Sequence, residues 1–196
     1  IADEKQLTNI SFHAENIMKY GFEEQQYDVV FFHASLHHFD NIPEFLQQVV
    51  IQNLRPKGLL IINEFVGSSR LQYSKTQIKY INKAISIIPK EYRKIFKTNI
   101  YKNNYYGSGV LRMIIADPSE CVDSQSIIPA IHEKFNVVEE KFYGNNILQS
   151  ALKDISHHFV ILDSTKREVL QEIFALEDEL LENHPSDSVF GIYELK

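Results

Sequence analysis

The stretch that decides the fold is YDVVFFHASLHHFDNIPEFLQQVVIQNLRPKGLLII, residues 27–62. It contains two continuous apolar runs, Val29 to Phe32 and Leu59 to Ile62. Runs that are apolar on both faces are typical of strands buried within a parallel sheet. The apolar residues between the runs recur at the spacing of one helical face: Phe45, Leu46, Val49, Val50 and Leu54. The stretch therefore predicts two adjacent parallel strands joined by a right-handed helical crossover.

Residues with strong conformational preferences mark the ends of the predicted helix. Asp40 or Asn41 can cap its first turn, which contains Pro43. Pro56 and Gly58 end the helix before the second strand begins. Both boundaries agree with the strand–helix–strand pattern.

The remaining sequence continues the alternation of strands and helices within a single predicted domain, residues 1–196. Apolar and polar residues alternate over Asn9–Glu15, which predicts a short strand, and further strands are predicted over 136–143 and 189–195. Helical spacing predicts helices over 76–88, 91–97, from Ser124 or Ser126 to near Phe135, 147–155 and 167–182. Residues 99–109 indicate a loop or lid, and Asp117-Pro118 indicates a turn.

The composition is that of an ordinary globular domain and excludes several classes of function. The chain has 196 residues, a formal net charge of -6 and scattered Lys and Arg side chains, which argues against a nucleic-acid partner. No apolar run approaches the roughly 20 residues of a membrane-spanning helix. Cys121 is the only cysteine, so neither a disulfide framework nor a thiolate metal site is expected. These features predict a cytoplasmic protein without nucleic-acid or membrane partners, and leave its oligomeric state open.

Two loops follow the predicted buried strands, residues 33–39 and 64–70. Sheets of this kind bind ligands at the carboxyl ends of their strands. The first loop holds His33, His37 and His38, and an imidazole there could act as a general base near neutral pH. The alternative is that His37 and His38 only hydrogen-bond the backbone where the strand meets the helix. A metal site is not predicted, because neighbouring side chains diverge and no further ligand is evident.

The second loop and a later aromatic segment supply candidate ligand-binding residues. A carboxylate at Glu64 could accept a hydrogen bond from a ligand hydroxyl or amine, and Arg70 could clamp a ligand carboxylate. The alternative is that both side chains simply point into solvent. Tyr101, Tyr105 and Tyr106 could form a wall of a substrate site, or could pack over an exposed edge.

Several motifs resemble one known family. YDVVFFHASLHHF, residues 27–39, is followed by a helix and by LRPKGLLII, residues 54–62. This pair resembles the class I S-adenosylmethionine-dependent methyltransferases, whose form is roughly [FY]-D-V-V, then L-H-H, a helix, L-[KR]-P-[GK]-G and an apolar strand. Residues 12–16, FHAEN, resemble the end of that family's preceding strand. The segments 63–72, 116–120, 124–129 and 142–144 resemble a subgroup of bacterial small-molecule methyltransferases.

The resemblance implies an α/β fold with a Rossmann-like class I methyltransferase sheet, mostly parallel with an antiparallel closing strand. It also implies that the chain is the C-terminal two-thirds of that domain, without the first strands and the glycine-rich cofactor loop. We therefore expect no tight cofactor binding by this chain alone. A helical insertion after the second buried strand, residues 70–130, would form a lid over the acceptor.

The same resemblance implies a site for S-adenosylmethionine and a small-molecule acceptor, for which a sugar or secondary metabolite is our guess. His37 or His38 is the expected base or orienting group. The expected cofactor-binding residues are Glu15, Asn16, Ile17, His33, Ala34 and Ser35. At the position beside the adenine, Asn16 replaces the family's acidic residue. The expected substrate-binding residues are Glu64, Arg70, Tyr73, Tyr105 and Tyr106. The alternative function is a non-catalytic module that keeps the fold and binds a ligand or partner.

Overall fold

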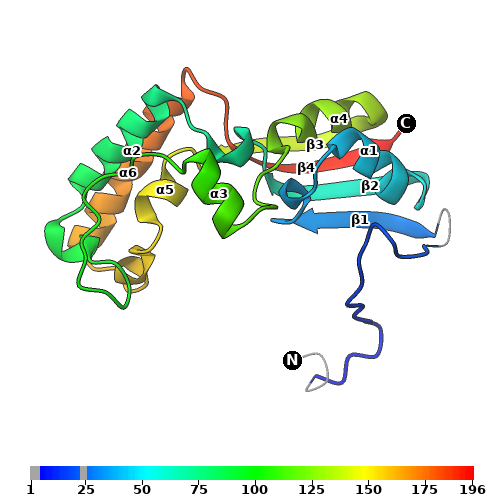
Figure 1. Cartoon of the computed structure of the whole chain (residues 1–196), viewed down its shortest axis with the longest axis horizontal. Helices are drawn as coiled ribbons and strands as arrows, with labels where there is room; N and C mark the ends of the chain where they lie inside the picture. The colour runs from blue at the N-terminus through cyan, green and yellow to red at the C-terminus, as the bar shows by residue number, and fades with distance from the viewer. Residues whose placement is uncertain (1–4, 23–25) are drawn as a thin grey trace.

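The computed structural model describes residues 5–22 and 26–196 and shows a four-stranded sheet with two groups of helices (Figure 1). The strands are β1 (Tyr27–His33), β2 (Leu54–Phe65), β3 (Phe135–Gly144) and β4 (Ser188–Leu195). One helical group covers a face of the sheet, and the other lies beyond the carboxyl ends of β1 and β2 (Figure 1). In the described part of the chain, no helix combines the length and apolar character needed to span a bilayer.

The sheet has the strand order β1-β2-β4-β3. β1 pairs in parallel with β2, so that Phe31 lies opposite Ile61. β4 is antiparallel to both β2 and β3. β1, β2 and β3 therefore run in one direction and β4 in the other. The two strands predicted within residues 27–62 and the strands predicted over 136–143 and 189–195 are therefore confirmed. The mostly parallel sheet with an antiparallel closing strand is confirmed as well.

The crossover between β1 and β2 is confirmed, but its helix is shorter than predicted. It consists of α1 (Ile42–Phe45) and a π-helical continuation, η2 (Leu46–Ile51). Leu54 belongs to β2, where it pairs with Tyr27 and is buried in the core. Asn41 occupies the predicted N-cap position, but its side chain makes no capping hydrogen bond. The Asp123 carboxylate instead accepts a hydrogen bond from Ile42 N at 3.1 Å.

Two predictions for the first strands are wrong. Residues 9–15 form no strand and are exposed, with Phe12 at 82%. A strand requires a hydrogen-bonding neighbour, and this segment instead leaves the sheet as an extended trace (Figure 1). β1 is an edge strand, and the face opposite the helices leaves Val29 and Phe31 exposed. The expected burial of β1 on both faces is therefore not observed.

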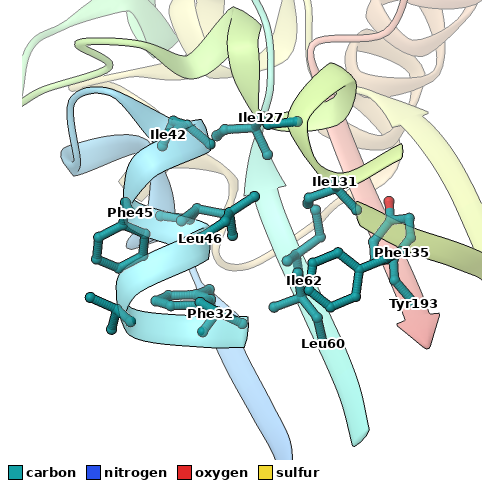
Figure 2. Close-up of a cluster of buried hydrophobic side chains, with 14 of the residues drawn as sticks. Phe32, Ile42, Phe45, Leu46, Leu60, Ile62, Ile127, Ile131, Phe135 and Tyr193 are labelled. Carbon is teal, nitrogen blue, oxygen red and sulfur yellow. The ribbon is translucent and has the colours of Figure 1, made fainter. Parts of the chain in front are cut away.

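The first core lies between the sheet and the helices α1, η2 and α4 (Ile127–Lys134). Figure 2 shows apolar side chains from the sheet meeting those of the two helical segments. They include Phe32, Ile42, Phe45, Leu46, Leu60, Ile62, Ile127, Ile131, Phe135 and Tyr193. Each large apolar side chain that is fully buried stabilises the fold by about 1.5–3 kcal/mol. This core fixes the crossover on the sheet.

The second core joins α2 (Lys75–Ile87), α5 (Leu148–Leu152) and α6 (Ser164–Leu181). The predicted helices of 76–88 and 167–182 are thereby confirmed to within a few residues. The segment predicted as a helix over 91–97 is only a 3-10 turn, η4 (Lys90–Arg93). The short helix α3 (Val110–Ala116) was not predicted. The remaining 3-10 turns are η1 (Leu36–His38), η3 (Ser69–Leu71), η5 (Ser124–Ser126) and η6 (Ser156–Phe159).

A buried residue, Asp187, links α2 of the second helical group to the end of β2. Its Oδ2 accepts a hydrogen bond of 2.6 Å from Gln77 of α2. Its backbone oxygen accepts a hydrogen bond of 2.7 Å from Val66 N, immediately after β2. Burial raises the pKa of Asp187 to about 6, the hydrogen bond from Gln77 acts in the opposite direction, and the nearby Glu177 raises it further. The carboxyl group of Asp187 therefore binds a proton more tightly in the folded protein than in the unfolded chain.

We predict that Asp187→Asn raises the free energy of unfolding at pH 7 by roughly 1–3 kcal/mol. The free energy of unfolding of the native protein should itself rise as the pH falls through about 6 toward 4. The reason is that the Asp187 carboxyl group takes up its proton at a higher pH in the folded state than in the unfolded state. Urea unfolding at pH 7 and pH 5 measures the difference. Asp178→Asn, at an exposed position of α6, is the matched control. A native protein whose stability relative to Asp187→Asn does not change with pH would contradict this account.

Candidate functional site

The turn that follows β1 is the starting point of the site. Ala34 takes a positive φ of 47°, and its N–H donates to Asn63 O in β2 at 2.9 Å. A left-handed conformation costs an L-residue about 1–2 kcal/mol. The 3-10 turn η1 then directs the backbone N–H groups of Ser35 and Leu36 toward one carboxylate. The turn is therefore held in a strained shape by a partner outside it.

That partner is Glu64, which lies near the end of β2 and is only 2% exposed. Its Oε1 accepts hydrogen bonds from Ser35 N at 2.6 Å and Leu36 N at 2.8 Å. Its Oε2 lies 2.7 Å from His37 Nδ1. Burial acts to raise the pKa of Glu64, but the hydrogen bonds from these three donors outweigh it and lower the pKa below its usual value. Glu64 is thus not in solvent, and both of its oxygens already accept hydrogen bonds from the protein; its predicted contact with a substrate stays a prediction.

The carboxylate determines how His37 presents its ring. Since an ionised carboxylate can only accept, the neutral form of His37 carries its proton on Nδ1 and leaves Nε2 as an acceptor. His37 is itself buried and lines a cavity at the carboxyl ends of β1 and β2. Glu64 therefore positions an imidazole nitrogen that can accept a proton or a ligand.

His38 is oriented in the same way by a different partner. Its Nδ1 lies 3.0 Å from Ser119 Oγ, and that hydroxyl donates to Asp117 Oδ1 at 2.7 Å. The serine oxygen therefore accepts from His38 Nδ1–H, which again leaves Nε2 available. The Ser119 side-chain and backbone hydrogen bonds hold the pKa of Asp117 below its usual range. Glu120, the next residue, lies 4.0 Å from His37 Nε2 and 3.8 Å from His38 Nε2.

Two cavities meet at this point. The smaller, of about 160 Å³, is lined by His33, Ala34, His37, Asn63, Glu64, Phe65, Leu71, Glu120, Cys121, Tyr143, Asn145, Gln149 and Ser188. The larger, of about 530 Å³, lies among the second group of helices. Leu71, Glu120 and Gln149 line both cavities, so these residues form a common wall. The smaller cavity lies where ligands are expected in a sheet of this type.

The larger cavity combines aromatic and charged groups. The rings of Tyr73 and Tyr105 line it with their centroids 6.2 Å apart. Lys102 Nζ donates to Ser150 O and Lys153 O, and burial lowers the pKa of this amine to about 8. Burial raises the pKa of the Tyr73 hydroxyl well above its usual value. The cavity therefore offers ring surfaces together with polar groups that are already partly oriented.

The structure brings together some of the predicted site residues and not others. His33, Ala34, His37, Glu64, Tyr73 and Tyr105 line the two cavities. Tyr106 is 88% exposed and lines neither cavity. Arg70 reaches Glu120 O at 3.4 Å through its guanidinium, and it lines neither cavity.

The N-terminal candidates also lie outside the two cavities. Glu15 is exposed, Asn16 Oδ1 accepts a hydrogen bond from Met18 N at 3.0 Å, and Ile17 packs against the first core. The cofactor role of these three residues stays a prediction.

Sequence reasoning missed Glu120, Ser119 and Asp117 as site residues. The segment ADPSE, residues 116–120, carried a family resemblance, but no spacing rule connects it with the histidines of η1. Cys121 lines the smaller cavity, where burial raises the pKa of its thiol far above the usual value. The thiol is therefore a neutral residue of the cavity wall.

Comparison with known proteins identifies a family and similar folds. A family model described as a methyltransferase domain matches residues 1–158. The solved structure of the MccD protein shares 14% identity, and the match covers 100% of this chain and 72% of that chain with a TM-score of 0.47. An S-adenosylmethionine-dependent methyltransferase from Mesorhizobium loti shares 12% identity, covering 96% and 70%, with a TM-score of 0.46.

Another similar solved structure is that of an enzyme named for a different reaction. The [4+2]-cyclase SpnF shares 12% identity with this chain, and the match covers 99% of this chain and 59% of that chain with a TM-score of 0.48. No curated protein sequence matches the chain.

We predict that Glu64→Ala lowers the free energy of unfolding by about 3–5 kcal/mol, because it leaves buried donors without an acceptor. Glu64→Gln keeps one acceptor oxygen and should cost about 1–3 kcal/mol. Urea unfolding measures both. Nitrogen-15 spectra of the imidazoles should show that His37 loses its single tautomer in Glu64→Gln. Equal stability of Glu64→Ala and the native chain would contradict the proposed role, and Glu172→Gln, at an exposed position of α6, is the control.

Proposed function

Because this chain belongs to the methyltransferase domain family, we propose that it transfers the methyl group of S-adenosylmethionine to a small-molecule acceptor. The observation that carries the proposal is the common wall between the two cavities, beside the oriented His37. A donor at the strand ends and an acceptor in the larger cavity would meet at that wall. Such a reaction depends mainly on aligning the two reactants.

The cofactor side of the proposal rests on the smaller cavity. Its volume of about 160 Å³ is below the roughly 300–1,000 Å³ of common ligand pockets. The described residues therefore fit the methyl-bearing end of S-adenosylmethionine and not the whole molecule. His33 and Ala34, which line this cavity, would contact that end. Ser35 remains a candidate beside them, and Glu15 and Asn16 remain candidates for the adenine. The cofactor supplies an electrophilic methyl group on sulfur.

The acceptor side of the proposal rests on the larger cavity. The pair of Tyr73 and Tyr105 favours an acceptor that contains a ring, such as a sugar or a cyclic secondary metabolite. Most of the lining residues fall within 70–130, which supports the proposal that this segment is the acceptor lid. The end of the segment has a second role, because Ile127 of α4 packs in the first core.

His37 is the proposed base for an acceptor hydroxyl, with His38 as the alternative. Its Nε2 can take the proton from the hydroxyl as the oxygen attacks the methyl group. The other proton remains on Nδ1 of the ring, where it is hydrogen-bonded to the Glu64 carboxylate. The charge of that carboxylate stabilises the imidazolium that forms. An acceptor that is already nucleophilic would need His37 only for orientation.

We predict that S-adenosylmethionine binds the chain weakly at the strand ends, with a Kd in the range of about 1 μM to 1 mM. Titration followed by amide NMR should shift the backbone signals of Ala34 and Ser35 before those of α6. A non-catalytic module without a cofactor site would show no shifts at saturating ligand. That result, obtained also with a version extended at its N-terminus, would overturn the enzyme proposal.

We predict that His37→Gln lowers kcat for a hydroxylated acceptor by about 10²- to 10⁴-fold, with a smaller change in KM. Release of S-adenosylhomocysteine over a panel of hydroxylated ring compounds gives the assay. His158→Gln is the matched control, because the ring of His158 bonds Lys94 O away from both cavities. Unchanged turnover in His37→Gln would assign the base to another group.

A further inference from the structure

Three potential metal ligands converge at the common wall of the cavities. They are His37 Nε2, His38 Nε2 and the carboxylate of Glu120, and the three ligand atoms lie within 4.8 Å of one another. The histidine–carboxylate distances are 4.0 Å for His37 and 3.8 Å for His38. This arrangement differs from the sequence expectation, in which the neighbouring histidines diverge. In the 3-10 turn their ring centroids are only 4.4 Å apart.

Each imidazole is already oriented as a metal ligand would be. The Nδ1–H of His37 is held by the Glu64 carboxylate, and that of His38 by Ser119 Oγ. Histidines that bind metals almost always donate their second ring nitrogen in this way, because the outer partner fixes the tautomer and the direction of the ring. The two Nε2 atoms therefore face Glu120 without a change of tautomer.

The geometry points to a site for one divalent transition-metal ion, and we propose that His37, His38 and Glu120 bind Zn²⁺. Two imidazoles and one carboxylate suit Zn²⁺ and related ions, whereas Mg²⁺ prefers oxygen ligands only. Bonds of about 2.0–2.2 Å place neighbouring ligand atoms roughly 3–3.5 Å apart. The histidine–carboxylate separations of 4.0 Å and 3.8 Å would therefore contract by about 0.3–1 Å on ion binding, and the separation of the two imidazole nitrogens, at most 4.8 Å, by up to about 1.8 Å. The side chains of Glu120 and His38, 26% and 34% exposed, have room for that movement.

A bound ion would change what the residues at the common wall can do. Three protein ligands leave at least one coordination position for an oxygen from solvent or from a ligand in either cavity. An ion also takes up both Nε2 atoms, so ion binding and proton acceptance by His37 exclude each other. The inference does not depend on the proposed methyl transfer, because ion binding is measured without cofactor or acceptor.

Calorimetric titration of the native chain with Zn²⁺ should give one equivalent of tight binding, and Mg²⁺ should give none. Glu120→Gln and His38→Gln should each weaken Zn²⁺ binding by more than about 10-fold, and Ser119→Ala, which removes only the outer partner, by about 10-fold. Co²⁺ bound at the site should show the visible absorption bands of a four- or five-coordinate ion. Circular dichroism confirms that each variant is folded.

The matched control is the double substitution His157→Gln with His158→Gln. It removes another adjacent histidine pair, whose rings are 3.9 Å apart and for which no clustered carboxylate is found among residues 5–22 and 26–196. Zn²⁺ binding should be unchanged in this variant. The proposal is overturned if the native chain does not bind Zn²⁺, or if the control loses as much affinity as Glu120→Gln does.

Discussion

The strand-end site depends on one buried carboxylate, that of Glu64. Removing an ionised carboxylate from water costs several kcal/mol, and the group remains charged only where donors surround it. Here the donors are two backbone N–H groups of η1 and the ring of His37. The carboxylate thereby holds the turn after β1 against the strain at Ala34 and fixes the proton of His37 on Nδ1. Loop shape and imidazole chemistry follow from the same interaction.

The position of the site follows from how the two cores are arranged. The first core binds the crossover to one face of the sheet, and the second gathers helices beyond the carboxyl ends of β1 and β2. Residues from both regions line the cavities, and Glu120 lies at their boundary. Asp187 fastens the two regions together through Gln77 and Val66. A ligand at the common wall would therefore contact both regions at once.

Much of the fold could be predicted from the sequence, because its signals are local. The continuous runs in 27–62 and the apolar stripes of α2 and α6 specify their elements through hydrophobic periodicity. The wrong predictions concern features that depend on residues distant in the sequence. At the start of α1 the side chain of Asp123, and not that of the N-cap residue Asn41, accepts a hydrogen bond from Ile42 N, and residues 9–15 form no strand although their alternation indicates one.

The candidate site could be predicted only in part, for the same reason. The rule on strand ends directs attention to His37 and Glu64, but it does not reveal that they bond each other. The role of Glu64 depends on a register between β1 and β2 that no local pattern gives. Glu120 comes from a turn far along the chain, and its proximity to two imidazoles is a property of the tertiary fold alone.

The strand order also constrains how the molecule can be made. β4 lies between β2 and β3 in the sheet, yet it is the last of the four strands to leave the ribosome. Until then, β3 has no neighbour on which to form its ladder, and β2 is paired on one side only. Such non-local pairing is slow, and an unpaired strand edge invites association with other chains. The ladders on β3 and on the second edge of β2 therefore form only after β4 has been made, and until then those edges are open to association with other chains.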